Sequence, residues 1–190
     1  MTNVPLSPEE CSILIKQARR AIGDVVCTGQ FQHLDLDAYP ESLREPGATF
    51  VTLTRRRKLR GCVGTLEAIL PLIEDVCEHA AAAAVRDYRF PPVRPEELPE
   101  IEIEISRLTQ PQPLDYRCPE DLLALLRPGI DGVILHDGFA RATFLPQVWE
   151  KLPDPISFLS YLCQKMGSEP LLWQAKKLQV FTYQVEEIKA

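Results

Sequence analysis

The sequence predicts an α+β fold in which antiparallel β-sheets are flanked by helices. Two observations favour this class. The predicted strands follow one another as hairpins, and helical patterns do not alternate with single strands as they do in βαβ units. Residues 101–106 also alternate strictly between apolar and polar side chains, which is typical of a strand with one buried face. A doubly wound parallel sheet is therefore not expected.

The first half of the chain contains a clear helix start and a hairpin. Residues 7–10 read Ser-Pro-Glu-Glu, a capping box with proline at the first helical position, and a helical apolar stripe continues to Ile22. Residues 28–46 hold no clear element. The β-branched and aromatic residues at 49–54 predict a strand, and residues 59–66 are its expected hairpin partner.

A second helix is expected to begin at Pro71 and to run to about Arg86. It contains five consecutive alanines at 80–84, which favour a helix and permit close approach to another element. Residues 87–93 cannot continue the helix, because Pro91 and Pro92 bias the chain towards extended or turn geometry.

The second half is expected to contain two helices and three strands. Residues 119–127 and 155–166 predict helices, the latter ended by Gly167. The expected strands are 132–135 and 140–145, joined across residues 136–138, and a closing strand at 178–185.

The composition is that of an ordinary globular protein. The 190 residues, 45% hydrophobic and 25% charged, fit one domain or a domain with a smaller lobe. The net charge of −6 argues against a broad nucleic-acid-binding face. None of the six cysteines has C-x-x-C spacing, and we see no signal peptide or membrane-spanning apolar run. We therefore expect a cytoplasmic protein with free thiols.

The most informative stretch is Arg60-Gly61-Cys62-Val63-Gly64. On an extended strand Arg60 and Cys62 share a face about 7 Å apart, and a guanidinium near a thiol favours the nucleophilic thiolate. The flanking glycines permit close approach of a ligand or of another backbone. The alternative is a buried structural cysteine on a strand that glycine thins for packing.

A local basic cluster precedes this motif. Residues 55–58 and Arg60 are cationic, which suits a phosphate or a nucleic-acid backbone, but no aromatic residues are interleaved for base stacking. A solvated hairpin turn is the competing interpretation for residues 55–58.

Three further acidic and basic residues are candidates for the site. Asp87 and Arg89 form either a functional loop or an ion pair that fixes the helix exit. Glu104 is either a buried carboxylate that faces Arg60 across the sheet or a residue on its wet face.

No familiar catalytic, nucleotide-binding or metal-binding motif is present. The histidines at 33, 79 and 136 have no second ligand at metal spacing, although a pair between Cys62 and a histidine is open in three dimensions. We therefore expect no cofactor and no metal.

Several of these motifs, in this order, resemble the AMMECR domain family, also described as AmmeMemoRadiSam system protein A. The similarity covers most of the chain. The matching stretches are Gly47–Leu53, Leu59–Thr65, Asp87–Val93, Glu102–Ser106, Gly129–Val133, Phe144–Trp149 and Phe158–Gly167.

The resemblance implies a cytosolic protein of two unequal lobes with a cleft between them, the smaller lobe formed by an internal segment of a single AMMECR domain over residues 1–190. It also implies association with a Memo-like protein and a radical S-adenosylmethionine protein in a modification system. Within that system we expect a catalytic or substrate-handling component, and we name no reaction. The alternatives are a non-catalytic module that binds a small molecule or peptide and, third, RNA binding.

The residue roles implied by the resemblance follow its motifs. We expect Cys62 and Arg60 to be catalytic. The expected ligand-binding residues are Gly61, Gly64, Thr65, Glu67, Asp87, Arg89 and Glu104; Phe90 and Pro91 also match the family. Three positions depart from the family pattern: Tyr88 replaces a proline, Arg107 replaces a small or apolar residue, and Val63 replaces isoleucine.

Overall fold

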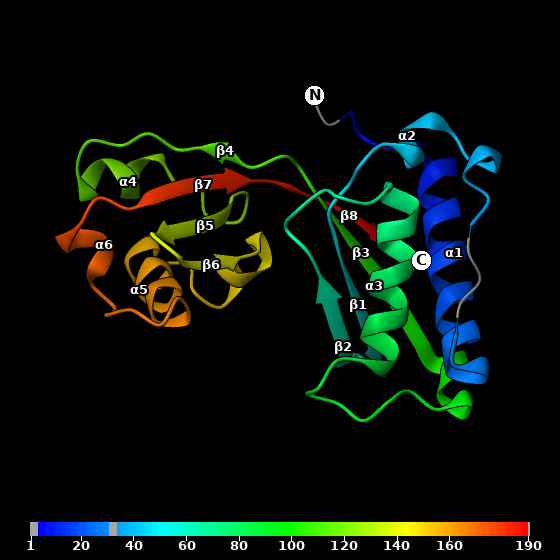
Figure 1. The fold of residues 1–190 in the computed structure, drawn as a ribbon. Coiled ribbons are helices and arrows are strands. Elements are labelled where there is room, and N and C mark those ends of the chain that lie inside the picture. The colour runs from blue at the N-terminus through cyan, green and yellow to red at the C-terminus, as the bar shows by residue number, and fades with distance from the viewer. Residues whose placement is uncertain (1–3, 31–33, 190) are drawn as a thin grey trace. The chain divides into compact units, whose positions relative to one another are not determined.

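Two four-stranded antiparallel sheets organise the chain, in a computed structural model that describes residues 4–30 and 34–189 (Figure 1). Each sheet belongs to its own compact unit. The first unit is built from the chain up to Leu108 together with the residues from Glu186 onward, and the second is Thr109–Val185. The predicted α+β class is confirmed.

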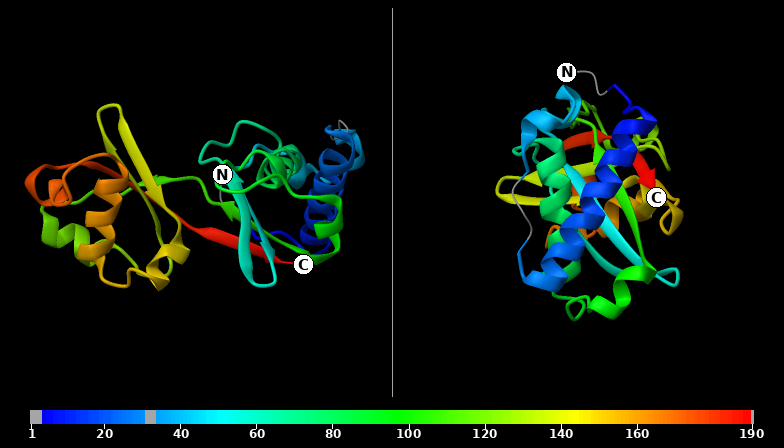
Figure 2. Two further views of the ribbon diagram at one scale, coloured as in Figure 1. Left: turned by 90° about the horizontal axis from the view of Figure 1, so that it is seen from below. Right: turned by 90° about the vertical axis from the view of Figure 1, so that its right-hand side faces the viewer.

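The first unit contains the sheet with strand order β2-β1-β3-β8. Its elements in chain order are α1 (Pro8–Thr28), η1 (Leu36–Ala38), α2 (Glu41–Arg44), β1 (Thr49–Arg55), β2 (Lys58–Gly64), α3 (Leu72–Val85), η2 (Pro95–Glu100), β3 (Ile101–Leu108) and β8 (Val185–Lys189). Figure 2 shows α1 and α3 together on one face of this sheet.

The predicted capping box begins α1. The Ser7 hydroxyl accepts from the Glu10 N–H at 3.2 Å, and the Glu10 carboxylate accepts from the Ser7 N–H at 2.7 Å. Both bonds satisfy N–H groups that the first helical turn would leave without partners. The helix ends at Gly29, which has a left-handed φ of 82°.

The alternation in β3 divides the sheet into two faces. Ile101, Ile103 and Ile105 are buried in the core with α1 and α3, whereas Glu102 and Glu104 lie on the opposite face. The adjacent β1 repeats the pattern, with its buried side chains on the helix side. The face without these helices therefore carries mainly polar side chains, together with Phe50 of β1.

A two-residue turn joins β1 to β2. Arg55 pairs with Lys58, so the turn consists of Arg56 and Arg57, whose φ angles are 52° and 61°. Tight hairpins need positive φ at both positions, a conformation that costs a residue with a Cβ about 1–2 kcal/mol. The Arg56 guanidinium is held by Glu100 at 2.6 Å, which fixes one of these two residues.

A β-bulge interrupts the pairing of β2 at Arg60. Leu53 pairs with Gly61 and Thr54 with Leu59, so Arg60 has no opposite residue in β1. The extra residue re-aims its side chain relative to a regular strand. The sequence predicts a regular extended strand here and gives no indication of the bulge.

Close approach of α3 to β2 explains the first glycine of the motif. A Cβ at Gly61 would overlap the carbonyl oxygen of Ala83. The five alanines at 80–84 are all buried, since α3 packs against α1 on one side and against β1 and β2 on the other. Small side chains on the helix and no side chain on the strand bring the two backbones together.

The second unit contains the sheet with strand order β4-β7-β5-β6. Its elements are β4 (Gln112–Pro113), α4 (Pro119–Leu125), β5 (Gly132–Asp137), β6 (Ala140–Phe144), η3 (Pro146–Glu150), α5 (Pro155–Lys165), α6 (Leu172–Ala175) and β7 (Gln179–Tyr183). The rings of Trp149 and Phe158 stack with centroids 3.6 Å apart in its core.

The structure contains elements that were not predicted. The irregular stretch 28–46 contains η1 and α2, and the short elements η2, β4, η3 and α6 were not expected. The strand expected at 178–185 corresponds to β7, but it does not close the chain, because the unpredicted strand β8 follows and joins the other sheet. Within the described residues, no helix combines the length and apolarity needed to cross a membrane.

We predict that Gly61→Ala lowers the free energy of unfolding by about 2–3 kcal/mol, because the added Cβ forces α3 away from β2. Gly23→Ala is the control: it lies within α1 with open space around its Cα, so it should stabilise the protein by about 0.5–1 kcal/mol. Urea unfolding of both variants measures the difference, and equal effects would contradict the packing explanation.

Candidate functional site

Arg60 is clamped by an acidic residue and by the proline-rich loop. Its guanidinium donates to the Glu97 carboxylate at 3.0 and 2.9 Å and to the carbonyl oxygens of Pro91 at 2.8 Å and Pro92 at 3.2 Å. The Arg60 side chain is 12% exposed and that of Glu97 is 13% exposed. Such a largely buried, bidentate pair holds loop and strand together.

The Glu97 carboxylate binds arginines from two neighbouring strands, Arg60 of β2 and Arg55 of β1. Its carboxylate also accepts from Arg55 at 3.0 Å and from the backbone N–H of Arg94 at 2.9 Å. The hydrogen bonds from Arg60 are the main reason why the pKa of Glu97 is lowered from 4.5 to about 2. Glu97 is therefore ionised at neutral pH.

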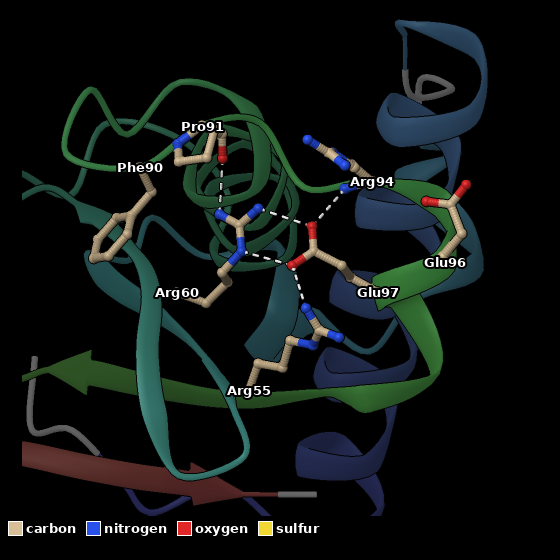
Figure 3. A pocket seen from close by; sticks show the side chains of 7 residues that line it. All are labelled: Arg55, Arg60, Phe90, Pro91, Arg94, Glu96 and Glu97. Atoms are coloured by element: carbon tan, nitrogen blue, oxygen red, sulfur yellow. Dashed lines mark hydrogen bonds and ion pairs between the residues drawn. The ribbon is translucent and has the colours of Figure 1, made fainter.

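A pocket of about 490 Å³ lies over this ion-pair network (Figure 3). We call it the arginine pocket. Its lining residues are Arg55, Arg60, Phe90, Pro91, Arg94, Glu96 and Glu97. Cys62 is not among them, so the two residues expected to be catalytic have different surroundings.

Cys62 lies half-buried and does not belong to either core. It faces Thr52 of β1, whose hydroxyl donates to the Cys62 sulfur at 3.3 Å. By contrast, Cys77 and Cys163 are fully buried, and burial raises the pKa of the Cys77 thiol to about 12. The alternative expectation of a core cysteine is therefore wrong for Cys62.

The pairing register extends this row across the sheet. Thr52 is directly opposite Cys62 on one side and Glu104 on the other, and directly opposite residues share a face. Glu104 forms an ion pair with Lys189 of β8 at 3.2 Å. Thiol, hydroxyl, carboxylate and ammonium thus follow one another on the polar face; the expectation that Glu104 faces Arg60 is wrong, because Arg60 pairs with Glu97.

Asp87 and Arg89 hold the backbone of Cys62. The Asp87 carboxylate accepts from the Cys62 N–H at 2.8 Å, and the Arg89 guanidinium donates to the Cys62 carbonyl at 3.1 Å. The two side chains also bind each other at 2.6 Å, which holds the pKa of Asp87 well below its usual range. Because β2 is an edge strand, this pair satisfies backbone groups that no neighbouring strand can reach.

The other predicted ligand-binding residues are explained by packing and local bonds. A Cβ at Gly64 would overlap the Thr49 carbonyl oxygen, so close backbone packing accounts for this glycine as it does for Gly61. Thr65 donates its N–H to Thr49 at 3.0 Å, and its hydroxyl accepts from the Glu67 N–H at 3.1 Å.

Three of the five cations in the basic cluster form ion pairs with two carboxylates. Arg55 and Arg56 pair with Glu100, and Arg55 and Arg60 pair with Glu97. Cations committed in this way are less available to a phosphate backbone.

Sequence reasoning missed the partners that complete these sites. Thr52 had a signal, since it occupies a polar position in the alternating strand β1. Glu97 had a weaker one, because Arg94 and Glu97 have the spacing of a capping box. The role of Arg94 in the pocket has no signal in the sequence.

A buried polar cluster lies beside the motif on α3. The Asp75 carboxylate accepts from the Thr49 hydroxyl at 2.6 Å and contacts Nδ1 of His79 at 3.2 Å. Thr49 and Asp75 are fully buried. His79 is thus engaged by Asp75, His33 lies outside the described residues, and the pairing of Cys62 with a histidine stays a prediction.

Fold and site together define an α+β protein with a half-buried thiol on a polar sheet face and a separate arginine-lined pocket. The AMMECR1 family model matches residues 15–188, and the chain belongs to this family. A protein of Methanothermobacter thermautotrophicus is 40% identical, covering 98% of this chain and 97% of the relative. A protein of Thermofilum pendens is also 40% identical, with 95% and 90% covered. The crystal structure of the uncharacterised protein PH0010 from Pyrococcus horikoshii matches with a TM-score of 0.87 and 34% identity, covering 96% of this chain and 92% of that one.

We predict that Glu97→Gln lowers the free energy of unfolding at pH 7 by about 3 kcal/mol, because it leaves the Arg60 guanidinium without its counter-charge. A carboxyl group with a lowered native pKa stabilises the fold above its unfolded pKa near 4.5 and loses this effect as the pH falls towards about 2. The difference between wild type and Glu97→Gln should therefore shrink across that interval.

Chemical denaturation at pH 7 and pH 2.5 measures this difference. Glu96→Gln, which changes an exposed neighbour on η2, is the matched control and should shift stability by less than about 0.5 kcal/mol at either pH. A difference for Glu97→Gln that stays constant with pH would contradict the ion-pair explanation.

Proposed function

We propose that this protein is a catalytic or substrate-handling component of a cytosolic modification system, in which Cys62 is the reactive group. The partners in this proposal are a Memo-like protein and a radical S-adenosylmethionine protein, as the resemblance implies. In this proposal the substrate binds at the polar face of the first unit's sheet.

One observation carries the proposal: the Cys62 backbone is fixed while its thiol is left half-buried on a polar face. Asp87 and Arg89 bind the N–H and carbonyl groups of Cys62, so the direction of its side chain is set. The sulfur lies beside the Thr52 hydroxyl, which donates a hydrogen bond to it at 3.3 Å. Positioning of this kind is what an active-site nucleophile needs.

Arg60 receives a different role from the one expected. Its guanidinium is bound to Glu97 and to two proline carbonyls, so Arg60 shapes the loop and pocket instead of acting on the thiol. In this proposal Arg60 is a positioning residue.

We predict that iodoacetamide modifies Cys62 in the folded protein at pH 7, because its sulfur is not enclosed in a core. Cys77 and Cys163 should react only after unfolding, since both are buried. The exposed Cys27 and Cys118 provide the reference rate for ordinary surface thiols. Mass spectrometry of tryptic peptides follows these five of the six thiols, and Cys62→Ser identifies the peptide that contains Cys62.

The reactive-thiol proposal requires Cys62 to react faster than Cys27 and Cys118 at pH 7. The half-buried position alone would make it slower, so a faster rate reports activation and not exposure. Labelling of Cys62 only in denaturant, or more slowly than both exposed cysteines, would overturn the role of the thiol.

A second candidate function is a non-catalytic module that binds a small molecule or peptide. The observation that favours it is the arginine pocket, which lies apart from the thiol. Retention of the chain by an immobilised Memo-like protein separates the two functions. Retention that is unchanged after alkylation of Cys62 and in Cys62→Ser supports the module, whereas loss on alkylation supports handling of substrate at the polar face.

A further inference from the structure

The base of the arginine pocket is formed by paired charges. Arg60 and Arg55 both bind Glu97, and Arg55 also binds Glu100 at 3.1 Å. These groups have already exchanged water for protein partners, so a ligand gains little by competing with them. The recognition of a ligand must come from the remaining lining residues.

Arg94 is the cation that remains available in the pocket. Its backbone N–H is bound to Glu97, while Figure 3 shows no interaction of its guanidinium with the other residues drawn. The residue is exposed, and its side chain extends over the pocket. Glu96 also lines the pocket, on the other side of Arg94, and the lining as a whole has three arginines and two glutamates, a formal charge of +1.

Phe90 and Pro91 supply an apolar wall. Figure 3 shows Phe90 and Arg94 on opposite sides of Arg60. The Arg89 guanidinium is 5.5 Å from the centre of the Phe90 ring, which helps to hold the ring. A ligand that touches both Phe90 and Arg94 therefore crosses above the Arg60–Glu97 pair.

We propose that the arginine pocket binds a small organic anion with a flat aromatic part. The anionic group pairs with Arg94, and the flat part rests against Phe90 and Pro91. The pocket volume of about 490 Å³ lies in the range that holds small molecules. Arginine binds carboxylates and phosphates alike through paired N–H groups, so the shared chemistry is an oxyanion.

The test uses four probes and chemical-shift titrations of the full chain. The probes are 2-naphthyl phosphate, 2-naphthoate, inorganic phosphate and 2-naphthol. We expect at least one naphthyl anion to shift the amide signals of Arg60 and residues 90–97, and to bind about tenfold more tightly than inorganic phosphate or 2-naphthol. The two naphthyl anions distinguish phosphate from carboxylate as the preferred oxyanion.

Two variants test the assigned contacts, and one provides the control. Arg94→Gln should weaken binding about tenfold, since it removes the charge while its backbone bond to Glu97 remains. Phe90→Ala should weaken the naphthyl anions but not inorganic phosphate. Arg86→Gln removes an exposed arginine outside the lining and should leave binding unchanged.

Several outcomes would overturn the proposal: no naphthyl anion binding at millimolar concentration, equal binding of 2-naphthol, or no effect of Arg94→Gln. The proposal does not rest on the reactive thiol. Cys62→Ser should bind the naphthyl anions as the wild type does, so failure of the thiol role and failure of the pocket are distinguishable.

Discussion

The close contact between Gly61 of β2 and Ala83 of α3 is the constraint on which the rest of the site depends. Without a side chain at Gly61, the helix backbone lies directly against the strand. The helix ends at Val85, so Asp87 emerges beside the strand edge and reaches the Cys62 N–H. The same loop then continues to the carbonyl groups that bind Arg60. One backbone contact thus sets the position of both the thiol and the pocket.

The motif from Arg60 to Thr65 therefore combines several tasks within one strand. Its glycines serve packing, its cysteine faces the polar side of the sheet, and its arginine anchors the proline-rich loop. The bulge at Arg60 makes this division possible, because it breaks the strict alternation that would place Arg60 and Cys62 on one face. Thiol chemistry and ligand recognition are accordingly assigned to separate groups.

Local sequence patterns predicted the main helices and strands, but they did not predict which distant segments pair with one another. The capping box at Ser7 and the alternation in β3 act through neighbouring residues, so the sequence alone shows them. No glycine or proline marks the boundary at Gln184 between β7 and β8, although the two strands belong to different sheets. Glu97 pairs with arginines about forty positions earlier, which no periodicity reveals.

The last strand, β8, completes the first sheet only after the whole of Thr109–Val185 has been made. During synthesis the edge of β3 that later pairs with β8 therefore stays unpaired while the second unit emerges and folds. Contacts between such distant segments also slow folding, because a long loop must close before they form. The second unit is continuous in sequence, so it can fold before β8 pairs with β3. Once it has folded, the long loop between β3 and β8 is already closed.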